Sequence, residues 1–155
     1  MTGRRASFLL GFAAPFFRVT AGAVLALSGY LKAVRHPAEF EATLASYWFF
    51  PGVLLAPLAR IVPWLELVVG LFLAAGYFTR ATALAGAALY MGFVGVLGQA
   101  ILRKLPLKDC GCFGQAGPHL QPIQALSLDV VMVVFCLLVF FDREKNLSAD
   151  RWIEK

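Results

Sequence analysis

Four long apolar stretches, separated by shorter polar segments, dominate the pattern of hydrophobic and polar positions along the chain. They cover residues 15–35, 57–78, 81–102 and 122–141. Each is close to the roughly 20 residues that a helix needs to cross the hydrocarbon core of a bilayer. The pattern therefore predicts an all-α integral membrane protein, a bundle of four transmembrane helices that forms a single domain over residues 1–155.

The segment between the first two stretches, residues 37–50, has a different pattern. Its large apolar residues recur at helical spacing, at Phe40, Leu44, Tyr47 and Trp48. Polar residues lie between them, which predicts an amphipathic helix. Tyr47 and Trp48 are residue types that favour the headgroup level of a membrane. We therefore expect this helix to lie on the membrane surface.

The composition supports a membrane protein and excludes one class of partner. Hydrophobic residues make up 60% of the chain and charged residues 15%, with a mean hydropathy of +0.75. Soluble domains carry about 25% charged residues. The modest net charge of +5 is typical of a membrane protein in which Lys and Arg residues flank the spans. Membrane lipid is the expected surrounding, and no basic run or aromatic motif indicates a nucleic-acid partner.

The ends of the chain bear on its orientation. The basic and apolar N-terminus is similar to a signal peptide, but Arg18 interrupts the apolar stretch and no small-x-small site follows. We therefore expect no cleavage. Four spans place both termini on one side, with residues 142–155 as a charged tail outside the bilayer. Because Lys and Arg are almost equally numerous on the two sides, charge alone leaves the orientation open.

Five polar residues interrupt the predicted spans: Lys32, Glu66, Gln99, Gln124 and Asp129. Because successive spans run in opposite directions, all five are expected in the same third of the bilayer, next to the loop 103–121. Charged groups inside hydrocarbon are costly and usually face the interior of a bundle. One interpretation is a structural pair of Lys32 with Glu66 that sets the helix register. The other is a polar pocket that handles protons or a ligand, and the two are compatible.

Small residues recur along one face of the third span. Ala88, Gly92, Gly95 and Gly98 are spaced so that they share this face. Small residues allow helices in a membrane to approach closely. The sequence therefore predicts tight packing of the third span through this face.

The loop before the fourth span contains two cysteines, Cys110 and Cys112, separated by one glycine. Cysteines at this spacing can close a small, strained disulfide, and strain makes a disulfide easier to reduce. Thiol–disulfide exchange is the favoured interpretation and needs no metal. A Cu(I) site formed with His119 and an inert loop are the alternatives.

The third cysteine, Cys136, lies about 21 Å along the fourth span at 1.5 Å per residue. A disulfide joins Cα atoms that are less than about 7 Å apart. Cys136 is therefore expected to be a small buried apolar residue and not a partner of the loop pair.

Four segments in order resemble the MauE branch of the DoxX-like membrane proteins, over roughly residues 15–141. They are "RVTAGAVLALSGYLKAVRHP" at 18–37, "FEATLASYWFFP" at 40–51, "PWLELVVGLFLAAGYFTR" at 63–80 and "DCGCFG" at 109–114. The resemblance implies a four-helix protein of the bacterial inner membrane. It also implies that Cys110 and Cys112 form a redox pair.

The resemblance further implies a place for that pair. The family is associated with maturation of the disulfide-rich small subunit of methylamine dehydrogenase. The loop with Cys110 and Cys112 would then be periplasmic and both termini cytoplasmic. Its partner would be a thioredoxin-like protein or a protein undergoing disulfide maturation, which makes the chain a candidate thiol–disulfide oxidoreductase.

The bundle is also similar in outline to vitamin K epoxide reductase and DsbB, which pass electrons to a quinone. A quinone is accordingly the cofactor that the resemblance suggests. Those enzymes carry a second cysteine pair, whereas residues 36–56 contain no cysteine. A partner would therefore exchange directly with Cys110 and Cys112. A non-catalytic membrane subunit or maturation chaperone, and a Cu(I)-handling protein, are the alternative functions.

Overall fold

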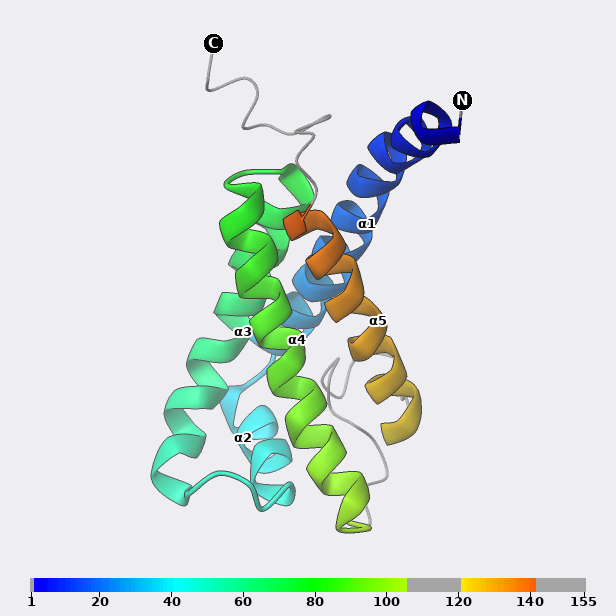
Figure 1. Ribbon diagram of the computed structural model, residues 1–155. Helices are drawn as coiled ribbons and strands as arrows, with labels where there is room; N and C mark the ends of the chain where they lie inside the picture. Colours follow the sequence, from blue (N-terminus) through cyan, green and yellow to red (C-terminus); the bar gives the residue numbers. More distant parts are fainter. Residues whose placement is uncertain (1, 106–120, 142–155) are drawn as a thin grey trace.

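The computed structural model describes residues 2–105 and 121–141, with side chains from residue 14 onward. The helices in chain order are α1 (Thr2–Ala33), α2 (Pro37–Ser46), α3 (Gly52–Ala75), α4 (Thr79–Leu102) and α5 (Pro122–Phe141). Figure 1 shows the four long helices side by side, with the short α2 at one end. Cys110, Cys112 and the charged tail 142–155 lie outside the described residues.

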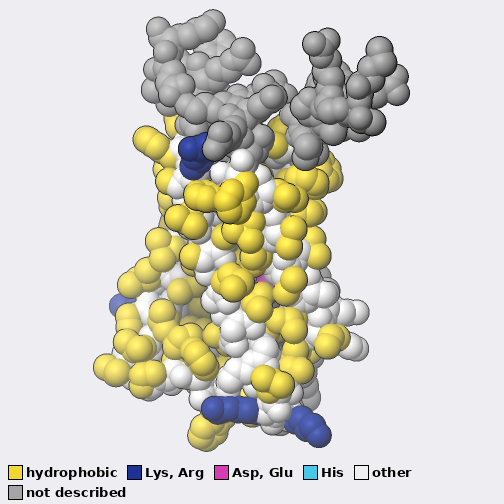
Figure 2. Space-filling view, in the orientation of Figure 1, with side chains coloured by type: hydrophobic (Ala, Val, Ile, Leu, Met, Phe, Trp, Pro, Cys, Tyr) yellow, Lys and Arg dark blue, Asp and Glu magenta, His cyan; other side chains and the backbone are white. Residues whose placement is uncertain are grey.

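The all-α fold with four candidate membrane spans is confirmed. Ala14–Ala33 of α1 and the whole of α3, α4 and α5 are apolar enough to cross a bilayer, at 20 to 24 residues each. α1 packs mainly against α3, and α4 mainly against α5. Figure 2 shows a face on which hydrophobic side chains predominate among the coloured groups of the middle, while most of the Lys and Arg side chains in view lie toward its two ends.

Two helices begin earlier than the hydropathy pattern predicts. α1 begins at Thr2, well before the expected residue 15. α3 begins at Gly52 and not at 57, because the extended backbone of Pro51 precedes its first turn while Pro57 lies inside the helix. Pro51, directly before the first helical residue, therefore marks the start of this helix, and Pro57 does not.

α1 and α3 cross in backbone contact at glycines. A Cβ atom on Gly29 would lie 2.5 Å from the backbone nitrogen of Leu67 and 2.6 Å from the carbonyl oxygen of Pro63. One on Gly22 would lie 2.6 Å from the backbone nitrogen of Ala74. Any side chain at these positions would force the two helices apart, so glycine sets the spacing between α1 and α3.

The predicted tight packing of α4 through its glycines is wrong. No atom of the described residues lies within 4 Å of a Cβ built on Gly92, Gly95 or Gly98. The core between α4 and α5 instead includes Tyr90 and Cys136, and Cys136 is buried, as predicted. Small residues permit the close approach of another helix but do not bring one about. Here no other described helix packs against the face formed by these glycines.

α2 begins where its sequence favours a helix start. His36 is the N-cap, its Nδ1 accepts a hydrogen bond of 3.4 Å from the backbone N–H of Ala38, and Pro37 follows at the first helical position. Phe40 and Leu44 pack against Ala59 of α3. The apolar face of α2 is thus turned toward the protein.

The two aromatic residues expected at the headgroup level differ in their surroundings. Trp48 is 79% exposed, whereas Tyr47 is only 4% exposed. Tyr47 lies on the side of the segment that faces the helices, because it continues the apolar face formed by Phe40 and Leu44. α2 packs mainly against α3 and lies at one end of the bundle (Figure 1).

Gly29→Ala is expected to destabilise the protein by about 1–3 kcal/mol, because the added methyl group overpacks the crossing of α1 and α3. The measurement is the free energy of unfolding in detergent micelles. Gly95→Ala is the matched control, because its Cβ meets no described atom within 4 Å. Equal stability of the two variants would contradict the close crossing.

Candidate functional site

A buried ion pair joins α1 to α3. Nζ of Lys32 lies 2.7 Å from Oε1 and 2.9 Å from Oε2 of Glu66. The hydroxyl of Ser28 donates a hydrogen bond of 2.7 Å to Oε2 of the same carboxylate. Lys32 is 4% exposed and Glu66 0%. The pairing of Lys32 with Glu66 that the sequence suggested is therefore present, with Ser28 as an additional donor.

The local sequence explains how these groups meet. Ser28 and Lys32 are four residues apart and therefore lie on the same face of α1, one turn from each other. Gly29 lies between them, and a Cβ atom there would be 2.8 Å from Cβ of Glu66. The missing side chain of Gly29 thus allows the carboxylate to reach both donors.

Two aromatic rings from other helices surround the ammonium group. Nζ of Lys32 is 5.0 Å from the ring centroid of Phe40 in α2 and 4.9 Å from that of Phe93 in α4. Both distances are within the range of cation–π attraction. Side chains from α1, α2, α3 and α4 therefore converge on one cationic group.

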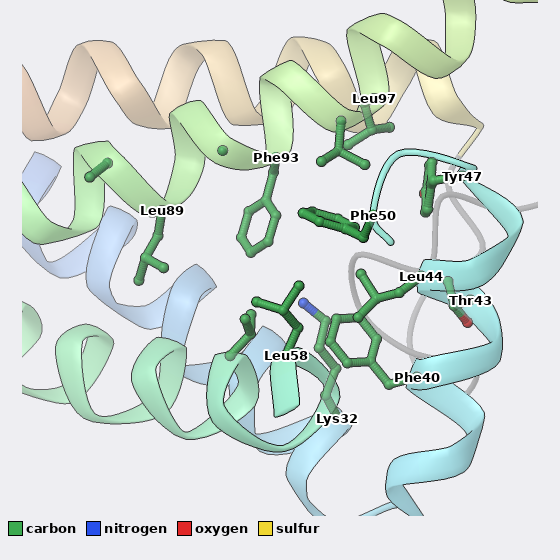
Figure 3. Close-up of a pocket in the computed structure, with 14 residues that line it drawn as sticks. Lys32, Phe40, Thr43, Leu44, Tyr47, Phe50, Leu58, Leu89, Phe93 and Leu97 are labelled. Atoms are coloured by element: carbon green, nitrogen blue, oxygen red, sulfur yellow. The ribbon is translucent and has the colours of Figure 1, made fainter. Parts of the chain in front are cut away.

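An apolar cavity of about 190 Å³ opens beside Lys32. Its lining residues from α2 and the segment that follows include Phe40, Leu44, Tyr47 and Phe50, and those from α4 include Ala88, Gly92 and Phe93. Leu58 and Val62 complete it from α3. Figure 3 shows the nitrogen of Lys32 pointing into the space between these side chains. The wall of the cavity is thus mainly apolar, and Lys32 is the one cationic side chain among the described residues that line it.

Asp129 of α5 is buried on the other side of Ser28. It lines a narrow space of about 10 Å³ together with Ser28, Tyr90 and Phe93. The hydroxyl of Tyr90 donates a hydrogen bond of 2.8 Å to the backbone carbonyl of Ala21. Ser28 therefore adjoins both buried acidic residues, because it contacts Glu66 and also lines the space beside Asp129.

The two glutamines lie apart from this group. The amide oxygen of Gln99, when turned toward Arg103, accepts hydrogen bonds of 2.8 Å from Nε and 3.1 Å from Nη1. Gln124 is exposed, and its Oε1 accepts a hydrogen bond of 3.2 Å from the backbone N–H of Gln121 at the start of α5. Neither glutamine lines either of these two cavities. Each instead forms hydrogen bonds at the end of a helix.

The members of the site that were missed at the level of the sequence include Ser28 and Phe93. Ser28 carried a signal, because it precedes Lys32 by one helical turn on the same face. Phe93 carried none, since a phenylalanine inside an apolar span is ordinary. Its place beside Lys32 depends on the packing of α4, which the hydrophobic pattern does not specify.

Comparison with known proteins shows to which family the chain belongs. Residues 9–142 match the model of the family described as methylamine utilisation protein MauE. The chain belongs to the MauE family. A relative from Methylophilus methylotrophus, methylamine utilization protein MauE, is 36% identical over 89 residues. The match covers 57% of this chain and 46% of the relative, so the chain spans about half the length of the relative. No solved structure matches the chain.

With four apolar helices, this MauE-family chain is a multi-pass membrane protein. The buried ion pair of Lys32 and Glu66 lies at the crossing of α1 and α3, and the apolar cavity lies next to Lys32. The ion pair can hold the register of the two helices, and it can also present an N–H donor to a molecule in the cavity.

Removing one partner of the ion pair is expected to cost more than removing both. Lys32→Met or Glu66→Gln alone should lower the free energy of unfolding by about 3–5 kcal/mol, because each leaves a buried group without its partner. The double variant Lys32→Met/Glu66→Gln should recover most of this loss. Unfolding in mixed micelles measures the cycle, and strictly additive effects would count against the pairing.

Proposed function

We propose that this chain is a thiol–disulfide exchange protein of the bacterial inner membrane that acts in methylamine utilisation. Cys110 and Cys112 are the exchanging groups, their loop is periplasmic and both termini are cytoplasmic. The partner is a thioredoxin-like protein or a protein undergoing disulfide maturation. Disulfides persist in the periplasm, whereas the cytosol keeps thiols reduced, so an exchange pair of this kind belongs on the periplasmic side.

The position of the cysteine loop carries the proposal. α4 ends at Leu102 and α5 begins at Pro122, at the end of the bundle where α2 lies. The described residues that border the connection, 103–105 and Gln121, therefore lie at that end of the bundle. A partner protein in the aqueous phase can approach a pair of cysteines in such a connection.

The spacing of the cysteines supports exchange rather than a structural bridge. In the exchange, one thiolate of a dithiol attacks a sulfur of the disulfide on the other protein, and the displaced sulfur leaves as a thiolate. The second thiolate then attacks the mixed disulfide. Two electrons move from the dithiol to the disulfide, and the displaced thiolates take up protons from water. The small ring formed by Cys110 and Cys112 favours such a step because a strained disulfide is more easily reduced.

The remaining cysteine supports direct exchange with the partner. Cys136 is 0% exposed inside α5, packed in the core with α4. The chain contains three cysteines in all, so Cys136 is the one left outside the loop pair. Electrons pass between the partner and Cys110–Cys112 without a second cysteine pair in this chain.

Thiol labelling tests both the redox state and the side of the loop. In intact cells, a membrane-impermeant maleimide should label Cys110 and Cys112 only after reduction, because oxidised cysteines do not react. Cys136 should stay unlabelled throughout, since it is buried in the bundle. Mass spectrometry counts the labels. Labelling without reduction would contradict a resting disulfide, and no labelling after reduction would contradict a periplasmic loop.

Growth on methylamine tests the function itself. In a strain of Methylophilus methylotrophus lacking its MauE protein, this chain should restore growth on methylamine. Cys110→Ser/Cys112→Ser should fail to restore it, because the exchange needs both sulfurs. Cys136→Ser is the matched control and should restore growth. Equal growth with the double variant would favour a non-catalytic maturation chaperone.

A further inference from the structure

We infer that the groove between the end of α1 and α3 binds a membrane phospholipid whose head carries a net negative charge. The guanidinium of Arg60 pairs with the phosphate, Arg35 is a second donor, and the acyl chains lie along the exposed side of α3. The inference concerns the outer surface of the bundle and therefore goes beyond thiol exchange.

Arg60 occupies an unusual position for a charged residue. It lies within the apolar span formed by α3, about two turns after the helix begins at Gly52. The other charged residue of α3, Glu66, is buried and paired, whereas Arg60 is exposed. Among the described residues, no carboxylate forms an ion pair with Arg60. A charge on the outer side of a span is costly without a partner, and a lipid phosphate is the anion that this position meets.

A groove of about 480 Å³ adjoins Arg60. Its lining residues from the end of α1 and the connection to α2 include Lys32 and Arg35, and those from α3 include Arg60 and Trp64. A guanidinium group matches a phosphate in shape and can donate two parallel hydrogen bonds to it. The groove thus combines two guanidinium groups with an aromatic side chain.

The antiparallel packing of α1 and α3 brings the two arginines to a similar level. A Cβ atom on Gly29 would lie 2.6 Å from the carbonyl oxygen of Pro63, while the earlier Gly22 lies against a later part of α3. Each step toward the end of α1 is therefore a step back toward the start of α3. Arg35, which follows the end of α1, accordingly comes near the level of Arg60.

The charges around the groove favour a head with a net negative charge. Lys32 is balanced by Glu66 at 2.7 Å, and Arg35 lies 3.7 Å from Glu39. The second pair is partly exposed, so water screens it, and the guanidinium of Arg35 keeps further N–H donors for a ligand. Arg60 supplies the remaining positive charge, which one phosphate diester would balance. A head that also carries its own cation would bring that cation next to the guanidinium groups.

The side of α3 that follows Arg60 suits the rest of the lipid. Trp64 lies one turn after Arg60 and is 61% exposed, and Val68 lies one turn further and is also exposed. Both line the groove. Residues four apart share one face of a helix, and tryptophan favours the level between head groups and hydrocarbon. Along this face, charged, aromatic and aliphatic side chains therefore follow one another in the same order as the parts of a phospholipid.

The test measures lipid binding next to Trp64 by fluorescence quenching. The full-length protein carries Trp48→Phe/Trp152→Phe, which leaves Trp64 as its only tryptophan. It is reconstituted in phosphatidylcholine bilayers containing phosphatidylglycerol with brominated chains, which quench tryptophan on contact. Brominated phosphatidylcholine at the same fraction is the reference. We expect phosphatidylglycerol to bind beside Trp64 about fivefold more tightly than phosphatidylcholine, the size that one partly exposed ion pair can give.

Two arginine variants locate the site. Arg60→Gln should abolish the preference for phosphatidylglycerol, because it removes the charge that pairs with the phosphate. Arg80→Gln is the matched control, since it removes the same charge from an exposed position at the start of α4 that does not line the groove. It should keep the preference. Both arginines are exposed, so both variants are expected to fold.

Equal quenching by the two lipids, or an unchanged preference in the Arg60→Gln variant, would overturn the inference. Loss of the preference in the Arg80→Gln variant as well would show that overall charge attracts the lipid, which contradicts a site in the groove. Brominated phosphatidylethanolamine should quench as phosphatidylcholine does, and a preference equal to that for phosphatidylglycerol would contradict selection of a net negative head.

A soluble phosphate compound provides the last control. Glycerol 3-phosphate in excess should not displace phosphatidylglycerol, because it lacks the acyl chains that lie along α3. Displacement would identify a soluble phosphate compound as the ligand and would overturn the assignment to a lipid. None of these measurements depends on Cys110 or Cys112, so their outcome is independent of the thiol-exchange proposal.

Discussion

The rest of the structure depends on the neutralisation of one buried charge by another. An ammonium or a carboxylate alone inside a bundle surrounded by lipid would be strongly destabilising. Lys32 and Glu66 can both be buried only if α1 and α3 cross at the height where the two side chains meet. Gly29 makes that crossing close enough. The rings of Phe40 and Phe93 then gather around the ammonium, which fixes where α2 and α4 pack.

The bundle consequently has two unlike ends. At one end α2 lies beside the apolar cavity and the ion pair, and α4 ends and α5 begins at that same end. At the other end α3 turns into α4 through Gly76, whose left-handed backbone (φ 78°) ends α3 against the guanidinium of Arg18. The buried ion pair lies toward the first end, whereas the buried Arg18 lies at the second.

The sequence was a good guide where one physical constraint dominates. The length and hydropathy of the spans predicted the four long helices, and the alternation of their directions brought Lys32 to the level of Glu66. The sequence was a poor guide to features that depend on which residues pack against one another. Tyr47 and Trp48 are both aromatic residues of the kind found at the headgroup level, yet Tyr47 is buried and Trp48 is exposed, because α2 ends at Ser46 and the backbone of Trp48 is left-handed (φ 51°). Gly29 and Gly92 look alike in sequence, yet one touches a backbone and the other borders a cavity.

The buried lysine also has a consequence for how the protein enters the membrane. The α1 span has a mean hydropathy of 1.3, the lowest among the four described spans, whose other values are 1.9, 1.7 and 2.5. A lysine within a helix weakens its insertion by roughly 2.5–3.5 kcal/mol at the helix centre and less near its end. The carboxylate that compensates Lys32 is synthesised 34 residues later, in α3. During biosynthesis the charge of Lys32 therefore gains its partner only when α3 has been synthesised.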